Sequence, residues 1–254
     1  MTDKTRLVYA GIAALVLLAP TPGRALDQAC HTRSDYDVTL TNAALQFDRK
    51  TAPPQILEMR RGSLSVDHTA VALGTNDRKR VAAFETRVRA LVPKIKALAT
   101  RGVDLMVLAI REEAAKTSPA SAADPQLNAR VDARARELKQ KIAKSTTSKE
   151  WHVDALQGYM ALMLSDVAPL LMGDLAQKAL DLTFKGDLAG VVALKDRAAA
   201  LRPSLEARIR AKLEVLQPAI DGLCPSLREL DRLENRIARA LPDGSRLNLI
   251  KLES

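Results

Sequence analysis

Histidines and paired carboxylates are the side chains of this chain that could bind a metal or move protons. The three histidines are His31, His68 and His152, and none has a cysteine, histidine or carboxylate partner at the spacing that metal ligands need. Glu112 and Glu113 form a carboxylate pair, but neighbouring positions on a helix point apart, which disfavours shared acid–base work. We therefore expect neither a metal nor a cofactor.

The motifs of familiar enzyme classes are missing as well. The sequence has no Gly-x-Ser-x-Gly elbow, no glycine-rich phosphate loop and no His-Glu-x-x-His. A hydrolase can use carboxylates that are far apart in sequence, which no spacing rule exposes, so a hydrolase with dispersed carboxylates stays open. We expect a non-enzymatic protein first and an enzyme last.

Basic side chains gather on two stretches that are expected to be helical. The formal net charge is +9, with 39 lysines and arginines against 30 aspartates and glutamates. Such a face suits anions or an anionic membrane surface, and the alternative is an ordinary solvated face. The candidate anion-binding residues are Arg80, Arg87, Lys94 and Arg101 in the first stretch and Arg197, Arg208 and Lys212 in the second.

The first 25 residues have the pattern of an export signal. A positively charged start is followed by an uncharged apolar run from Leu7 to Pro20 and by the small-x-small cleavage site Gly23-Arg24-Ala25. The run is too short to span a bilayer. We expect a mature protein that begins near Leu26 in the periplasm of a Gram-negative bacterium. There its basic surface would meet anionic lipid or lipopolysaccharide rather than nucleic acid.

Two cysteines, Cys30 and Cys224, lie beyond this signal. An even count in an exported chain predicts that they form a disulfide. The bridge would tie the mature N-terminus to a point near the C-terminus, and closing so long a loop is worth about 4–5 kcal/mol in chain entropy.

The residues after the signal predict a small antiparallel β-meander. Apolar and polar residues alternate in short runs, with Arg60-Arg61-Gly62 and Asp67-His68 as tight turns. Such a sheet is too thin to be stable alone, so one face must pack on helices. The expected strands are 36–41, 45–47, 56–59, 63–66 and 69–73.

From Thr75 the apolar spacing becomes helical. A long amphipathic helix is predicted to reach Thr117, kinked or split at Pro93. After a linker, Asp124 and Pro125 open a second helix. Three more helices are expected: from the capping box of Thr147 and Glu150 to Leu182, from Gly186-Asp187 onward, and from Pro218 to Leu241.

One segment is apolar all round. Tyr159 to Met172 belongs either to a core or to an interface, and Asp166 and Pro169 prevent it from spanning a bilayer. Together these elements predict an α+β, mostly α fold: a signal peptide over 1–25 and a single domain over 26–254. Within that domain we expect a β-meander over 26–74 packed on long, mainly antiparallel helices over 75–241, and a closing strand over 246–252 that could pair with the meander.

The order of these features resembles a known family. An early Ala29-Cys30, a short β segment, a long helix with a central proline and a late cysteine–proline motif are similar to the YggN-like family of proteobacterial periplasmic proteins, a domain of unknown function. The resemblance implies a periplasmic location and a one-domain architecture, and it supplies no activity. Its residues are Val38-Thr39-Leu40, Gly62-Ser63-Leu64-Ser65-Val66, Leu91-Val92-Pro93 and Leu223-Cys224-Pro225-Ser226-Leu227, followed by Leu230, Leu233 and Glu234.

Three functions follow in order of preference. The first is a non-enzymatic interaction or binding module of the cell envelope. The second is a binder of anionic lipid or lipopolysaccharide that uses its basic amphipathic helices. The third is the hydrolase with dispersed carboxylates.

Overall fold

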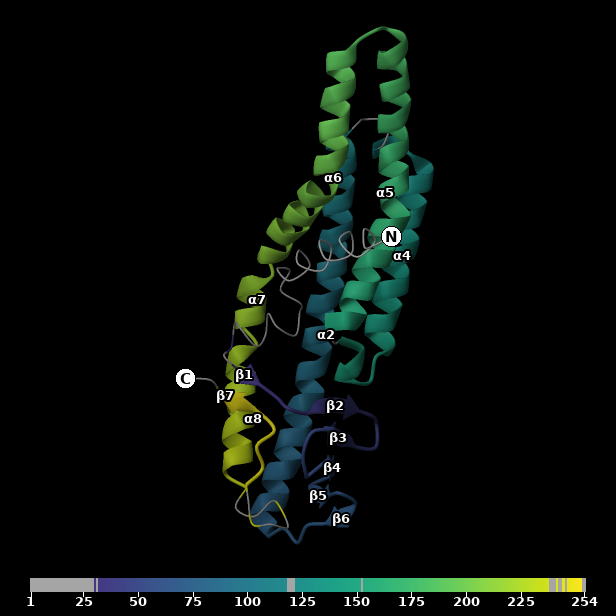
Figure 1. The fold of residues 1–254 in the computed structure, drawn as a ribbon. Coiled ribbons are helices and arrows are strands. Elements are labelled where there is room, and N and C mark those ends of the chain that lie inside the picture. Colours follow the sequence, from purple (N-terminus) through teal and green to yellow (C-terminus); the bar gives the residue numbers. More distant parts are fainter. Residues whose placement is uncertain are drawn as a thin grey trace, which may run out of the picture.

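The computed structural model describes residues 30, 32–117, 122–151, 153–237, 241, 244 and 246–252, with side chains of the helix over 153–184 described at 165, 167, 169, 170, 172, 173 and from 175 on. The fold is α+β and mostly α, as predicted: a small antiparallel sheet is followed by long helices (Figure 1). The predicted signal segment, His31 and His152 lie outside the described residues.

The sheet is a five-stranded meander in the order β2-β3-β4-β5-β6, with every neighbouring pair antiparallel. Both predicted turns form. Arg61 and Gly62, and then Asp67 and His68, have positive φ angles, which match the twist of the flanking strands. The strands are β2 (Asp37–Leu40), β3 (Leu45–Asp48), β4 (Ile56–Arg60), β5 (Ser63–Val66) and β6 (Thr69–Ala70).

Alternation along the strands gives the sheet one apolar face. Leu45 and Phe47 of β3, like their partners on β4 and β5, are buried. This face packs on the first half of α2 (Thr75–Thr117), where Phe84 meets Phe47 edge to face at a ring distance of 6.0 Å. The sheet is therefore stabilised by a helix, as its thinness requires.

Helix α2 contributes to both apolar cores of the molecule. It runs unbroken for 43 residues, about 65 Å, with Pro93 inside it, so the predicted split does not occur. Its first half shares an apolar core with the sheet, α8 and the C-terminal tail, and its second half shares another with α4, α5 and α6. Two cores thus lie one after the other along one helix.

The helices after α2 begin largely where their caps predict. Asp124 accepts a hydrogen bond from the N–H of Gln126 at the start of α4 (Pro125–Lys144), and Asp187 accepts one from Gly190 at the start of α6 (Leu188–Glu214). Helices α5 (Val153–Phe184) and α6 form a hairpin whose end extends beyond α2 and α4 (Figure 1). No helix among the described residues is long and apolar enough to cross a membrane.

The predicted capping box at Thr147 does not form. The Thr147 hydroxyl accepts from the N–H of Lys149, and a 3-10 helix, η1 (Ser148–Trp151), precedes α5. The reason is that this segment follows the edge of β2: Leu40 donates its N–H to the carbonyl of Thr146, and Thr39 bridges Thr147. The edge of β2 is thereby covered by the segment that leads into η1.

The last predicted helix is two helices, α7 (Gln217–Asp221) and α8 (Cys224–Asn235). Pro225 explains the break, because it has no N–H to donate to the carbonyl of Asp221 and its ring clashes there. The break places Cys224 beside Cys30, and the predicted disulfide is present, with Cα atoms 5.2 Å apart.

The predicted closing strand is shorter than expected, and it pairs with the N-terminal segment 26–74 outside the five-stranded meander. Only β7 (Lys251–Leu252) is a strand, and it pairs with β1 (Thr32–Arg33) in a separate two-stranded sheet. Ahead of it, Leu249 is fully buried in the first core, but its N–H donates to the carboxylate of Glu234. A side chain therefore satisfies the backbone that a neighbouring strand would otherwise satisfy.

Candidate functional site

Part of the predicted basic face holds two helices together. On α6, the Arg208 guanidinium donates from Nε to Glu113 Oε2 at 2.8 Å and from Nη1 to Glu112 Oε2 at 3.3 Å. Lys212 Nζ donates to Glu112 Oε1 at 2.6 Å, and this hydrogen bond is the main cause of a lowered Glu112 pKa. Arg208 and Lys212 thus fasten α6 to α2.

This cluster corrects the expectation for the adjacent carboxylates. Glu112 and Glu113 do not point fully apart, because both reach the same guanidinium of Arg208. Their charges are compensated there, which raises the pKa of Arg208 and stabilises the ionised form of Glu112. A general acid needs a raised pKa, whereas the pKa of Glu112 is lowered. The ion pairs with Arg208 therefore suit a structural role rather than proton transfer.

Of the other predicted cations, some make contacts that hold the fold together and others are exposed to solvent. Arg80 Nη1 donates to Asp77 Oδ1 and to the backbone carbonyl of Arg236, both at 2.7 Å, and so ties α2 to the end of α8. Arg101 and Arg197 are exposed on α2 and α6. The seven candidates therefore do not form one continuous face.

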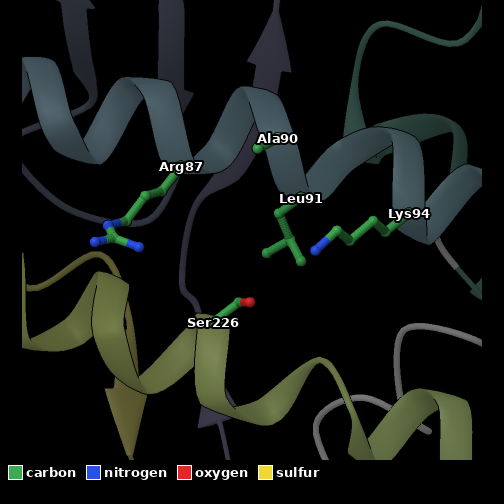
Figure 2. Close-up of a pocket in the computed structure, with 5 residues that line it drawn as sticks. All are labelled: Arg87, Ala90, Leu91, Lys94 and Ser226. Atoms are coloured by element: carbon green, nitrogen blue, oxygen red, sulfur yellow. The ribbon is translucent and has the colours of Figure 1, made fainter.

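Two of the predicted residues line the same hollow, between α2 and α8 (Figure 2). Arg87 and Lys94 are two helical turns apart on α2, and Ser226 in the first turn of α8 lines the hollow with them. Lys94 extends toward Leu91, whereas the Arg87 guanidinium points away from Lys94 (Figure 2). The hollow has a volume of about 130 Å³, and the buried Leu91 lies between the two cations. Two cations and a hydroxyl around so small a space suit an oxyanion, although Glu229 already holds Arg87 at 3.1 Å.

Glu234 is a buried carboxyl group that the sequence analysis did not single out by its chemistry. It is 2% exposed, and its carboxylate accepts the N–H groups of Leu249 and Ile250. Burial raises its pKa to about 7, against the lowering effect of those two hydrogen bonds. A raised pKa is also typical of a general acid, but both oxygens face backbone, so the group fastens the C-terminal tail.

A second surface feature was also missed: the end of the α5–α6 hairpin exposes large apolar side chains. Leu180 is 59% and Phe184 88% exposed on α5, and Leu188 is 72% and Val192 57% exposed on α6. The signal was present in the sequence, since both pairs are spaced by four residues on either side of the turn at Gly186. The four residues form no continuous apolar run, because charged and polar residues lie between them.

The segment that the sequence analysis did single out is partly described. Val167 is 1% exposed in the second core, and Leu170 packs against that core. Met172 is 38% exposed, at the end nearer the hairpin turn. The described residues of 159–172 therefore include core positions at one end and a surface position at the other.

Histidine offers no metal centre in the part of the chain that the structure describes. His68 is exposed in the β5–β6 turn. Within those residues there is no group of three or more histidine, cysteine, aspartate or glutamate side chains placed to hold a metal ion.

No curated protein and no solved structure matches this chain. A family model described as "Protein of unknown function (DUF2884)" matches residues 30–250, which include both cysteines, the meander and all the described helices. The match covers most of the chain, and the protein therefore belongs to the DUF2884 family.

Proposed function

We propose that this protein is exported to the periplasm and acts there as a non-enzymatic binding module of the cell envelope. The pattern of residues 1–25 supports export. The disulfide between Cys30 and Cys224 fits an oxidising compartment. The order of motifs that resembles the YggN-like periplasmic proteins is consistent with the same location.

One observation carries the binding role: the apolar end of the α5–α6 hairpin. Its four side chains, Leu180, Phe184, Leu188 and Val192, are each more than half exposed. Several exposed apolar side chains at one end of a hairpin cost solubility and are typical of a region that a partner covers. The hairpin end is therefore the binding surface.

Cell fractionation and cross-linking test this proposal. We expect the protein in the periplasmic fraction of a Gram-negative host, with a mass that places its first residue near Leu26. A photo-reactive amino acid at Phe184 is expected to form a reproducible adduct with an envelope component, whereas the same group at Val215, 57% exposed at the far end of α6, is not. A cytoplasmic, uncleaved protein would refute export, and equal labelling from both positions would refute the binding surface.

A second candidate function is the binding of an anionic group, such as a lipid or lipopolysaccharide phosphate, at the hollow between α2 and α8. The observation in its favour is that Arg87, Lys94 and Ser226 line one hollow. We expect Lys94→Ala to weaken salt-sensitive binding to vesicles containing phosphatidylglycerol, and Lys144→Ala, an exposed lysine on α4, to leave it unchanged. If the two variants bind alike, the hollow is not the anion site.

A further inference from the structure

The arrangement of apolar side chains around the hairpin end identifies the kind of partner that can cover it. Leu182 of α5 faces Gly190 of α6, because a Cβ atom added at Gly190 would lie 3.0 Å from Leu182 Cδ1. This contact defines the inner side of each helix. With 3.6 residues per turn, a residue two positions from an inner one lies on the opposite, outer side.

The exposed side chains lie on both outer sides of the hairpin. Leu180 and Phe184 are each two positions from Leu182, and Leu188 and Val192 are each two positions from Gly190. The apolar surface therefore faces away from the hairpin in two opposite directions. A flat protein surface can cover one of these sides, whereas a fluid apolar medium surrounds both.

The length of the apolar end fits a membrane interface. Each exposed pair spans about one helical turn, roughly 6 Å along the axis, and apolar groups of interfacial helices are buried about 5–10 Å deep. Lys178 and Lys195 lie eight and nine residues from Gly186, which places both about 12–14 Å from the turn. There, long basic side chains can reach lipid phosphates while their stems remain among apolar groups.

The charges at the hairpin end indicate how the partner is held. From Lys178 to Val192 two lysines balance two aspartates, so the end has no net charge. Asp187 accepts the N–H of Gly190 at the turn. Asp181 is exposed, and a charge at this position allows the hairpin end to enter an apolar medium only to a shallow depth. Attachment must then rest on burial of apolar area, which salt does not screen.

We propose that the end of the α5–α6 hairpin, with Phe184 at its centre, inserts into the lipid–water interface of a membrane. The proposal rests on the binding role argued above and names its partner as a lipid surface. It differs from an anionic-lipid role for the basic helices, because the hairpin end requires no anionic lipid.

Vesicle flotation of the oxidised, mature protein tests the proposal. The vesicles are phosphatidylcholine alone, or phosphatidylcholine with phosphatidylglycerol, in low and high salt. Val192→Asp and Val215→Asp are matched variants, because both valines are 57% exposed on α6 or at its end and only Val192 belongs to the hairpin end. We expect the wild type to float with both vesicles in both salts, Val192→Asp and Phe184→Asp to lose about tenfold or more in affinity, and Val215→Asp to bind like the wild type.

Three results would overturn the lipid partner, and each has a different meaning. Flotation with phosphatidylglycerol vesicles only, abolished by salt and unaffected by Phe184→Asp, would assign binding to the basic surface. A dimer in sedimentation equilibrium that Phe184→Asp dissociates, without flotation, would assign the hairpin end to a second copy of this chain and leave its binding role intact. A monomer that never floats and forms no cross-link from Phe184 would refute the binding role together with the lipid partner.

Insertion itself is measured by a separate readout. Phe184→Trp places an indole at the hairpin end, and brominated phosphatidylcholine quenches an indole that enters the bilayer. We expect quenching for Phe184→Trp beyond that of the wild type, and none beyond it for Val215→Trp. Equal quenching in the two variants contradicts insertion of this end even if the protein floats.

Discussion

Glu234 should make the stability of this protein fall as pH rises through neutrality. The carboxyl group is 2% exposed and accepts hydrogen bonds from the N–H groups of Leu249 and Ile250. Burial is the main reason that its ionised form is disfavoured, and the charge of Asp231 on the same helix acts in the same direction. Deprotonation therefore places a negative charge in an apolar core.

The size of the effect follows from the two pKa values. The pKa of Glu234 is about 7 in the folded protein, whereas an unperturbed glutamate, as in the unfolded chain, has a pKa of 4.5. The folded state therefore binds this proton more tightly than the unfolded state. The contribution is fully present below pH 4.5, declines as the unfolded chain ionises first, and is lost above pH 7. The difference of about 2.5 pH units corresponds to about 3 kcal/mol.

Urea denaturation of the oxidised protein at pH 4.5, 6, 7 and 8 measures it, with Glu234→Gln as the reference. Glutamine cannot titrate. Its amide nitrogen is a hydrogen-bond donor and cannot accept from a backbone N–H, so one of the two N–H groups loses its acceptor. The variant is therefore expected to be about 1–3 kcal/mol less stable than the wild type at pH 4.5. As pH rises, the advantage of the wild type should shrink by about 3 kcal/mol. Arg228→Gln, at an exposed position on the same helix, should show the same difference from the wild type at every pH. A wild-type advantage that stays constant or grows with pH refutes the reasoning.

Two other tests concern the ties between distant segments. Replacing Cys30 and Cys224 by serine removes a link across 194 residues. Relative to the oxidised wild type, the free energy of unfolding is expected to fall by about 5 kcal/mol. A loss below about 1 kcal/mol would mean that the unfolded chain gains little conformational freedom without the disulfide. Glu113→Ala leaves Arg208 without its nearly buried partner and should lower the free energy of unfolding by about 3 kcal/mol. Glu137→Ala, which removes only exposed ion pairs, should cost clearly less by the same denaturation, and equal losses would show that burial of Glu113 has no energetic consequence.

Local patterns account for what the sequence predicted well. The strand alternation placed the meander within one or two residues in most strands, and the caps Asp124 and Asp187 placed the starts of two helices. Each of these signals lies within a few residues of the structure that it determines. A backbone that twists into a hairpin at Asp67, or a side chain that satisfies a free N–H at a helix start, needs no distant partner.

What the sequence did not predict depends on residues far apart in the chain. Arg208 lies 95 residues from Glu113, and Glu234 lies 15 residues from Leu249 across a bend, so no periodicity links either pair. The basic stretch on α6 looked like an anion-binding face because its carboxylate partners are on another helix. The hairpin end shows the converse: its residues are close in sequence, but only the fold leaves them uncovered.

Stability and binding can therefore be separated in this molecule. The disulfide, the Glu234 contacts and the β1–β7 pair fasten α8, the C-terminal tail and the start of the described chain to one another. Phe184, 88% exposed at the opposite end, has almost no folding contacts to lose, so Phe184→Asp should change the free energy of unfolding by less than about 0.5 kcal/mol. A side chain that adds so little to folding, yet exposes an aromatic ring to water, is what the proposed contact with a membrane requires.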